Sequence, residues 1–310
     1  MNISHLRYVV EVEKTGSITQ AAERLYMSQP NLSKAIRELE ASLGMSIFKR
    51  SSKGVVPTKK GEEFLHSAKS LLAHVEEVRA LYQTNKSGAQ KISISVPRAS
   101  YIAHAFTDFV NTLDMDSDIA INYYETNSDS TLHNVFEGEC NLGVIRYQAA
   151  SEQYYFTLLA GKGFKYEPVL SFTYMVLMSA RHPLAGQEKI TLSELAEYIE
   201  IAHGDLRTPF LTSGEKELEA KHDKKVIHVY ERGSQFDLLR LVPHTYMWVS
   251  PMPQELLDCY GLIQKKCQAP NHDYKDLLVY RGAYRLTGLD KTFLDELYKT
   301  RDEIVANVRP

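Results

Sequence analysis

One stretch, Ser28–Gly44, limits the fold of this chain more than any other. Ser28 and Pro30 are typical of the start of a helix, because a serine side chain accepts hydrogen bonds from first-turn amides and a proline needs no such bond. Gly44 is typical of a helix end, since glycine adopts the left-handed backbone conformation without a steric penalty. The stretch therefore predicts a helix with both ends marked.

The predicted helix has two chemically different faces. Apolar residues recur at spacings of three and four and predict one buried stripe, formed by Leu32, Ile36, Leu39 and Leu43. A second face carries amide, hydroxyl and cationic groups, at Gln29, Ser33, Lys34 and Arg37. Such groups read base edges and phosphates in the major groove of DNA. A charged outer face is also the rule for ordinary amphipathic helices, so this helix alone leaves both interpretations open.

Neighbouring segments favour the DNA-binding interpretation. Ser17 followed by Gln20 is a capping box and starts a short helix that runs to about residue 25. A tight link then leads to the longer helix, and two helices joined by a short turn are a DNA-binding arrangement. After Gly44, two short apolar runs flank a Ser/Lys/Gly turn and predict a hairpin. This hairpin is either a wing, with Arg50 and Lys53 facing backbone phosphates, or a solvated surface turn.

These residues form a longer motif with fixed spacings: Ser28-Gln29-Pro30-Asn31-Leu32-Ser33, Ile36-Arg37-Glu38-Leu39-Glu40, Leu43-Gly44, Ile47-Phe48, Arg50, and Pro57-Thr58 with Gly61. The motif resembles the signature of LysR-type transcriptional regulators, although Asn31 departs from the Ala, Ser or Thr that is commoner there. The resemblance implies a winged helix-turn-helix DNA-binding domain over residues 1–58. The residues expected at the DNA are Ser28, Gln29, Pro30, Asn31, Ser33, Lys34, Arg37, Arg50 and Lys53.

A long apolar pattern follows the motif. Apolar residues recur by threes and fours from residue 64 to residue 82, with no proline between them. Such a stripe suits a two-stranded helical pairing, or else a helix that lies against its own domain. The resemblance implies the first use, a linker and dimerisation helix with its hinge over residues 59–88. The expected contact residues are Leu65, Ala68, Leu71, Leu72, Val75, Val78 and Leu81.

From residue 91 onward, short strands alternate with helices, which predicts an α/β sheet. The fold class expected for the whole chain is therefore α/β, with an α-rich head. The resemblance implies further that residues 89–310 form a two-lobed effector-binding domain of the periplasmic-binding-protein type. Lobe I is expected at about 89–162 and 268–310 and lobe II at about 163–267, with crossovers near 161–168 and 266–271.

A candidate ligand site follows from the rule that α/β sheets bind ligands beyond the carboxyl ends of their strands. The residues at these positions are Arg98, Ser100, Tyr101, Asn127, Ser128 and Arg146 in one lobe, and His203, Gly204 and Gln235 in the other. Ser100 and Ser128 stand at expected helix starts, where backbone amides attract anions. With Arg98 and Arg146 nearby, they predict a small carboxylate or other anion as the effector. Each residue is otherwise an ordinary cap or surface group.

Charge is distributed unevenly along the chain. Residues 1–60 hold ten Lys and Arg against five Asp and Glu, whereas residues 91–310 hold 23 against 30. A basic head on an acidic body predicts that the head meets a polyanion. The sequence shows no apolar run long enough to span a membrane, no secretion signal and, with three cysteines, no disulfide framework. We therefore expect a cytoplasmic protein without a membrane partner.

The sequence predicts a regulator and not an enzyme. No pair of its eleven histidines stands at metal-ligand spacing with acids, and it has no Gly-rich phosphate loop or nucleophile elbow. No metal and no cofactor other than the effector is expected. The resemblance implies double-stranded operator DNA as a partner, homodimers that pair into homotetramers, and RNA polymerase as a candidate partner. Two alternatives stay open: a thiol sensor using Cys259 and Cys267, and a small-molecule binding protein without sequence-specific DNA binding.

Overall fold

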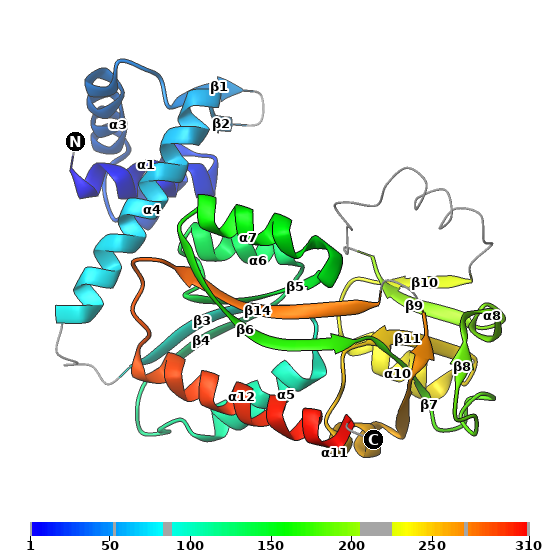
Figure 1. Cartoon of the computed structure of the whole chain (residues 1–310). Coiled ribbons are helices and arrows are strands. Elements are labelled where there is room, and N and C mark those ends of the chain that lie inside the picture. The colour runs from blue at the N-terminus through cyan, green and yellow to red at the C-terminus, as the bar shows by residue number, and fades with distance from the viewer. Residues whose placement is uncertain (1, 52–53, 83–88, 205–224, 270–271, 309–310) are drawn as a thin grey trace. The chain divides into compact units, whose positions relative to one another are not determined.

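The protein is described from a computed structural model of the whole chain (Figure 1). The structure describes residues 2–51, 54–82, 89–204, 225–269 and 272–308. Contacts divide the chain into two compact units. The N-terminal unit holds Met1–Ser87 with the short segments Phe136–Glu139 and Ala283–Arg285, and the C-terminal unit holds the remainder.

The N-terminal unit is a small helical domain with a hairpin. Its elements are α1 (Ile3–Thr15), α2 (Ile18–Arg24), α3 (Gln29–Leu43), β1 (Phe48–Ser51), β2 (Gly54–Pro57) and α4 (Lys59–Tyr82). β1 and β2 pair antiparallel, which confirms the predicted hairpin. The four helices share one hydrophobic core, which includes Val9, Ala21, Leu32, Ile36 and Leu65.

Local caps explain where the helices of this domain begin and end. Gly16 and Gly44 end α1 and α3 in the left-handed conformation, with φ of 62° and 67°. The Ser17 hydroxyl caps α2 by accepting a hydrogen bond from the amide of Gln20. Ser28 occupies the capping position of α3, but its side chain makes no capping hydrogen bond. The predicted start of α3 is therefore confirmed, whereas the predicted hydrogen bond is wrong.

The connection from the hairpin to α4 depends on two residues of the sequence motif. The Thr58 hydroxyl donates to the carbonyl of Ser46 (2.8 Å) and accepts from the amide of Gly61 (2.9 Å). Gly61 lies so close to Ile47 that an added Cβ would be 2.0 Å from the Ile47 carbonyl oxygen. Both residues therefore serve the packing of α4 against the chain that enters the hairpin.

The C-terminal unit contains two five-stranded sheets. The first, in the order β4-β3-β5-β14-β6, consists of β3 (Gln90–Val96), β4 (Ile119–Glu125), β5 (Leu142–Gln148), β6 (Phe164–Thr173) and β14 (Asp273–Arg281). β3 runs parallel to β4 and β5, whereas β14 runs antiparallel to β5 and β6. Figure 1 shows α5 (Ser100–Asn111) and α12 (Gly288–Val308) on one face of this sheet, and α6 (Ser128–Phe136) and α7 (Glu152–Gly161) on the other.

The second sheet forms the other lobe. Its strands, in the order β10-β9-β11-β7-β12, are β7 (Met175–Ser179), β9 (Ile199–His203), β10 (Val226–Val229), β11 (Thr245–Val249) and β12 (Leu262–Lys265). The helices of this lobe are α8 (Leu192–Leu195), α10 (Gly233–Leu241) and α11 (Gln254–Tyr260), and a small sheet pairs β8 (Ile190–Thr191) with β13 (Cys267–Gln268). Within the described residues, no helix combines the length and apolar character needed to cross a membrane.

The boundary between the lobes differs from the prediction. β6 pairs with β14 along its length and so belongs to the first sheet. The chain enters the second sheet only at Met175, so the predicted crossover at 161–168 is wrong. The predicted lobe boundary at residues 162 and 163 is wrong for the same reason. A single residue, Tyr174, separates β6 from β7, which makes the two strands look like one segment in the sequence.

We expect Gly61→Ala to destabilise the N-terminal domain by about 3 kcal/mol, because the added methyl group overlaps a backbone oxygen that cannot rotate away. The unfolding temperature of that domain, measured by calorimetry, should fall by about 10 °C or more. Gly186→Ala is the matched control, since a Cβ there meets nothing within 4 Å. Equal unfolding temperatures for the two variants would contradict the close approach.

Candidate functional site

α3 buries its apolar stripe and exposes its polar face. Leu32, Ile36 and Leu39 are at most 5% exposed. On the other side the structure exposes Gln29, Pro30, Asn31, Lys34 and Arg37, with Ser33 half-buried. The Arg37 Nε donates to the Ser33 carbonyl at 3.3 Å, and Lys34 lies 3.9 Å from the Glu38 carboxylate. These solvent-exposed contacts are weak, so both cations are available to a polyanion.

The turn between α2 and α3 is tight. Tyr26 adopts a φ of 52° there, in the left-handed region that large side chains rarely occupy. The Met27 amide donates to the Ala22 carbonyl at 3.0 Å, and Ala21 and Ala22 are buried. Small side chains let the two helices cross closely, while the Tyr26 ring is 98% exposed. Tyr26 and Met27 are thus the tight link that the sequence predicts between the two helices.

Two contacts tie the hairpin to the helices before it. The Glu40 carboxylate accepts from the amides of Ile47 (2.7 Å) and Phe48 (3.1 Å), which joins α3 to the start of β1. The Val55 amide donates to the Gly16 carbonyl at 2.9 Å. β1 and β2 thus have a fixed place beside α1 and α3. The Arg50 side chain and the whole of Lys53 lie outside the described residues.

The predicted dimerisation residues divide into three groups along α4. Leu65 and Ala68 are 1% exposed within a single chain, and Leu65 belongs to the core of the N-terminal unit. These two residues are not available to a partner helix, and their predicted role is wrong. Leu71 is 50% exposed, and Leu72 and Val75 are half-buried. The side chains of Val78 and Leu81 lie outside the described residues.

Arg146 and Tyr101 belong to a buried network within the first lobe. Arg146 donates to both carboxylate oxygens of Asp276, through Nε at 2.8 Å and Nη2 at 2.6 Å. The Tyr101 hydroxyl donates to the same carboxylate at 2.6 Å, and the Arg146 guanidinium lies 4.8 Å from the centre of the Phe172 ring. Arg146 is thus held by an internal carboxylate, and its predicted contact with an effector stays a prediction. Tyr101 is fully buried, so its predicted role at the effector is wrong.

Charge within this network is strongly stabilised. Burial raises the pKa of the Tyr101 hydroxyl well above its usual value, and the Asp276 carboxylate raises it further. Burial lowers the pKa of Arg146, but the charge and hydrogen bonds of Asp276, together with the Tyr174 and Tyr101 hydroxyls, raise it overall. Arg146 therefore keeps its charge, and Tyr101 is a neutral hydrogen-bond donor.

Asn127 and Ser128 form local hydrogen bonds at the start of α6. The Asn127 side-chain oxygen accepts from the amide of Ser130 at 2.9 Å. The Ser128 hydroxyl donates to the Arg146 carbonyl at 2.7 Å and accepts from the Arg146 amide at 3.0 Å. These bonds fasten α6 to β5, so both residues act here as caps, which is the ordinary role left open for them.

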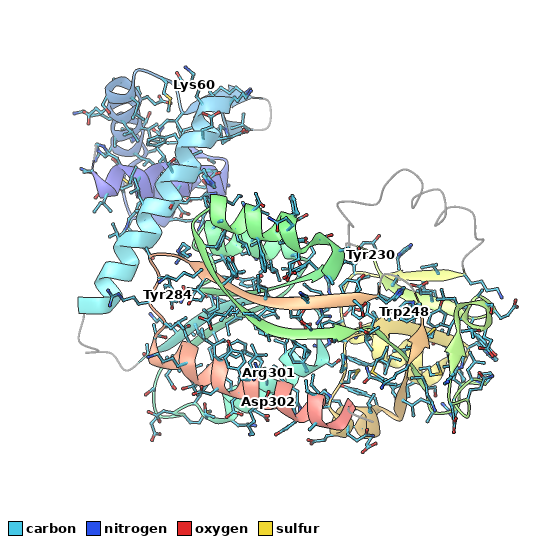
Figure 2. All side chains as sticks on the ribbon, viewed as in Figure 1. Lys60, Tyr230, Trp248, Tyr284, Arg301 and Asp302 are labelled. Atoms are coloured by element: carbon cyan, nitrogen blue, oxygen red, sulfur yellow. The ribbon has the colours of Figure 1, made fainter. Side chains whose placement is uncertain are left out.

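Arg98 and Ser100 do meet the second lobe. The Arg98 guanidinium donates to the carbonyl of Tyr230 at 3.1 Å, and Tyr230 follows β10 (Figure 2). Ser100 accepts a hydrogen bond from Nη2 of Arg232 at 2.9 Å. Arg232 also donates to the carboxylate of Glu125 at the end of β4. Arg98 and Ser100 of the first lobe thus bond to Tyr230 and Arg232 of the second, and Glu125, which ends β4, also bonds to Arg232.

The predicted residues of the second lobe lie at the ends of two elements. His203 ends β9, and the amide of Gly204 donates to the Val229 carbonyl at 2.9 Å. A Cβ on Gly204 would be 2.5 Å from the Tyr230 ring, so glycine permits that ring to pack there. Gln235, in the first turn of α10, is 4% exposed, and its side-chain oxygen has no hydrogen-bond partner among the described residues.

Arg232 and Glu125 were missed by the sequence analysis, although the rule that selected Arg98 applies to both. Glu125 is the last residue of β4, and Arg232 follows β10 by three residues. Both therefore stand at the carboxyl ends of parallel strands. Their position at strand ends was the signal in the sequence. The sequence analysis used that rule to select Asn127 and Gln235, which lie two and three residues further along the chain.

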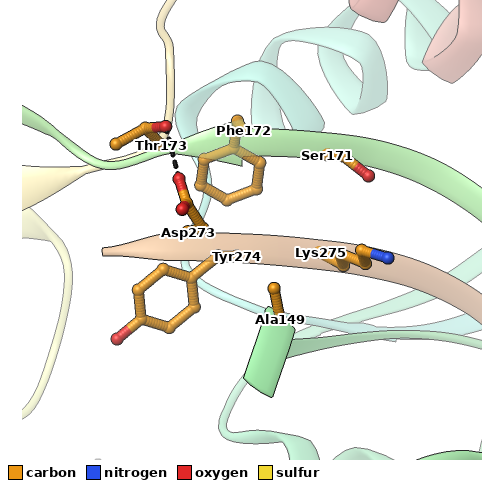
Figure 3. Close-up of a pocket in the computed structure, with 7 residues that line it drawn as sticks. All are labelled: Ala149, Ser171, Phe172, Thr173, Asp273, Tyr274 and Lys275. Carbon is orange, nitrogen blue, oxygen red and sulfur yellow. Dashed lines mark hydrogen bonds between the residues drawn. The ribbon is translucent and has the colours of Figure 1, made fainter. Parts of the chain in front are cut away.

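An open cavity of about 260 Å³ lies where the first sheet approaches its crossover (Figure 3). It is lined by Ala149, Ser171, Phe172, Thr173, Asp273, Tyr274 and Lys275. Its charged groups already have partners: Asp273 accepts from the Thr173 hydroxyl at 2.6 Å, and Lys275 lies 2.7 Å from the Glu152 carboxylate. A ligand here would compete with these internal bonds, so the cavity is a weaker candidate than the contact between the lobes.

The cysteines offer little support for a thiol sensor. Cys259 is exposed, whereas Cys140 and Cys267 are buried. Burial raises the pKa of the Cys267 thiol, which disfavours the reactive thiolate. Among the residues that the structure describes, no group of three or more His, Cys, Asp and Glu side chains is placed to hold a metal ion.

Comparisons with known proteins agree with the architecture. Residues 3–62 match the family model described as "Bacterial regulatory helix-turn-helix protein, lysR family". The chain is 29% identical over 201 residues to the HTH-type transcriptional regulator YnfL of Escherichia coli K12, and the alignment covers 64% of each chain. The chain thus spans less than two thirds of the length of this curated relative.

Two solved structures share the fold over nearly the whole chain. One is ArgP from Mycobacterium tuberculosis, with a TM-score of 0.63 at 17% identity and 97% of each chain covered. The other is full-length CbnR complexed with its target DNA, with a TM-score of 0.55 at 14% identity, covering 97% of this chain and 100% of that one. At such low identities the likeness is one of fold alone. It establishes a helix-turn-helix domain followed by a two-sheet α/β domain.

We expect Asp276→Ala to destabilise the C-terminal unit by about 3–5 kcal/mol, because it leaves the buried Arg146 charge without a partner. The double variant Arg146→Met with Asp276→Leu should recover much of that loss, since it removes both charges and fills the space. Chemical denaturation followed by fluorescence measures the two effects.

Glu152→Ala is the control for the Asp276 experiment. It breaks an ion pair with Lys275 in which both side chains are about one third exposed, so a loss of at most about 1 kcal/mol is expected. If Asp276→Ala lowers the free energy of unfolding by no more than this control does, Asp276 does not stabilise the buried charge of Arg146.

Proposed function

We propose that the chain is a sequence-specific DNA-binding transcription regulator that responds to a small effector, because residues 3–62 match the lysR-family helix-turn-helix model. The observation that carries the proposal is the polar face of α3, exposed on a domain whose core holds the opposite face. The basic charge of residues 1–60 adds attraction to the phosphates. Such a regulator acts in the cytoplasm, where operator DNA is.

Each group on this surface has a part suited to its chemistry. Gln29 and Arg37 offer the amide and guanidinium groups that form paired hydrogen bonds with base edges. Lys34 offers a point charge to a phosphate, and Ser33 a hydroxyl. Ser28, Pro30 and Asn31, at the start of the same helix, would face the groove beside them. Arg50 and Lys53, on the hairpin, are proposed to contact the backbone or the minor groove.

The exposed part of α4 is proposed to pair two chains. Leu71 is 50% exposed, so the core of the N-terminal unit leaves it available to a partner helix. Leu72 and Val75 lie on the following positions of the same helix. Two N-terminal domains paired in this way would read half-sites about 34 Å apart, one turn of the DNA helix. The family further suggests that two such dimers form a tetramer.

The effector site is proposed to lie between the two lobes of the C-terminal unit. Arg98 and Ser100 contact the second lobe directly, which supports their predicted role better than that of Arg146, Tyr101, Asn127 or Ser128. Ser100 starts α5, and the N-terminus of a helix attracts anions. A small carboxylate or similar anion therefore fits this place. An effector changes activity only if it binds two arrangements of the lobes with different affinity.

We expect Arg37→Ala to weaken binding to the operator by about 1–3 kcal/mol, because the variant loses a guanidinium contact with a base. Titrations should compare the DNA upstream of the protein's own gene with an unrelated fragment of the same length at one salt concentration. Arg240→Ala, which removes an exposed cation from the second lobe, is the control and should bind normally. An unchanged isotherm for Arg37→Ala would reject its role, and equal affinity of the native protein for both fragments would reject the function.

We expect Leu71→Glu combined with Val75→Glu to dissociate the dimer while leaving both units folded, because carboxylates cannot be buried in a helix pair without partners. Sedimentation velocity gives the oligomeric state, and circular dichroism checks the fold. Leu241→Glu, at an apolar side chain that is 62% exposed in the second lobe, is the matched control. A double variant that sediments like the control would refute the assignment of α4.

A further inference from the structure

Besides the bond from Arg98 to Tyr230, an arginine of the second lobe bonds to two residues of the first. Arg232 precedes α10 in the second lobe, and its guanidinium donates to the Ser100 hydroxyl and to the Glu125 carboxylate in the first. The side chains of Arg232 and Glu125 are only 15% and 18% exposed. A charge pair this well shielded from water is far stronger than one on the surface.

The surroundings of this arginine are those of an anion site. α5 begins at Ser100, and the residue before it provides no side-chain cap, so the positive end of that helix faces the guanidinium. α10 begins beside Arg232, where the exposed Glu231 carboxylate accepts from the amides of Gly233 and Ser234. A positive charge at the positive end of α5 is unfavourable by itself. Glu125 supplies the negative charge that this place requires.

A buried hydroxyl near the pair lacks a partner. Among the described residues, the Tyr123 hydroxyl has no hydrogen-bond partner. Tyr123 and Glu125 stand two residues apart in β4, so both side chains lie on the same face of the sheet. Burial raises the pKa of the Tyr123 hydroxyl, and the Glu125 charge raises it further. The ring is held by stacking on Phe106, with the ring centres 4.1 Å apart. A buried hydroxyl without a partner is costly, and a ligand bound at this place could provide one.

We propose that the place between the lobes is a carboxylate site which the chain's own Glu125 occupies, and that the effector's carboxylate displaces Glu125 from Arg232. The inference rests on the effector site proposed above and names the chemical class of its ligand and the competitor for it. Before the exchange Arg232 pairs with Glu125, and after it Arg232 pairs with the carboxylate of the effector. The released Glu125 side chain is then hydrated by solvent. No charge is left buried and unpaired in either state.

The exchange makes the site selective for charge and links the effector to the lobes. A neutral amide ligand of the same shape cannot displace Glu125 from Arg232, because the guanidinium would exchange a charged partner for a neutral one. With Glu125 bound, the second lobe is tied directly to the end of β4. With an effector bound, Arg232 contacts the ligand in place of Glu125. The two arrangements of the lobes therefore differ in their affinity for the effector.

The test uses acetate as the carboxylate probe and Glu125→Gln as the variant. The glutamine keeps an oxygen that can accept from Arg232 but removes the competing charge, so the full chain is expected to fold. Sodium acetate replaces sodium chloride at constant ionic strength, and the unfolding temperature of the C-terminal unit is followed. Half of the acetate-induced rise should occur at an acetate concentration about tenfold lower in Glu125→Gln than in the native protein.

Three controls separate this mechanism from general salt effects. Acetamide, which is neutral, should leave both proteins unchanged. Glu125→Gln combined with Arg232→Gln should lose the response to acetate. Glu152→Gln, which removes a carboxylate that pairs with Lys275 elsewhere in the same lobe, should respond like the native protein.

The proposal is overturned if Glu125→Gln shows no response to acetate or the same response as the native protein, or if the response persists without Arg232. DNA binding is measured separately on the native chain. If the native chain does not bind DNA sequence-specifically, the proposed function is rejected. The acetate experiment would still test the carboxylate site. Normal DNA binding by Glu125→Gln would confirm that this variant is folded.

Discussion

The N-terminal domain depends on the burial of one apolar stripe on α3. Leu32, Ile36 and Leu39 lie in a core to which the other helices contribute, and burying each such side chain is worth about 1.5–3 kcal/mol. The exposed contacts of Lys34 and Arg37 on the opposite face are worth about 1 kcal/mol or less each. The core therefore decides which way the helix faces. The polar residues on the exposed face of α3 contribute little to folding and are therefore available to bind a partner.

The sequence motif contains residues of both kinds, and only the structure separates them. Glu40, Thr58 and Gly61 belong to the same signature as Gln29 and Arg37, but they hold the hairpin and α4 in place. A fixed spacing in a sequence therefore reflects packing as well as DNA contact. It supports the assignment of the domain more firmly than the role of any one residue in it.

Local patterns in the sequence predicted the fold of the head but only part of the C-terminal unit. Periodicity, caps and glycines act over a few residues, so α3 and the hairpin were found where the structure has them. α7 and α11 leave little signal in the sequence, because α7 buries only Tyr155 and Leu159 and so has a weak periodic pattern, and α11 has seven residues. The boundary at Tyr174 was missed because β6 is defined by its pairing with β14, about 100 residues later in the chain.

The candidate effector residues show a sharper limit of the same kind. The rule of strand ends gives a position along the chain. It does not give the direction in which the side chain points or the residue with which that side chain pairs. Arg146 stands near the end of β5, yet Asp276, 130 residues away, holds it inside one lobe. A charge pair within one lobe has the same energy whatever the angle between the lobes. Arg232 and Glu125 belong to different lobes, so their interaction changes when the lobes move, and only such an interaction can couple ligand binding to that motion.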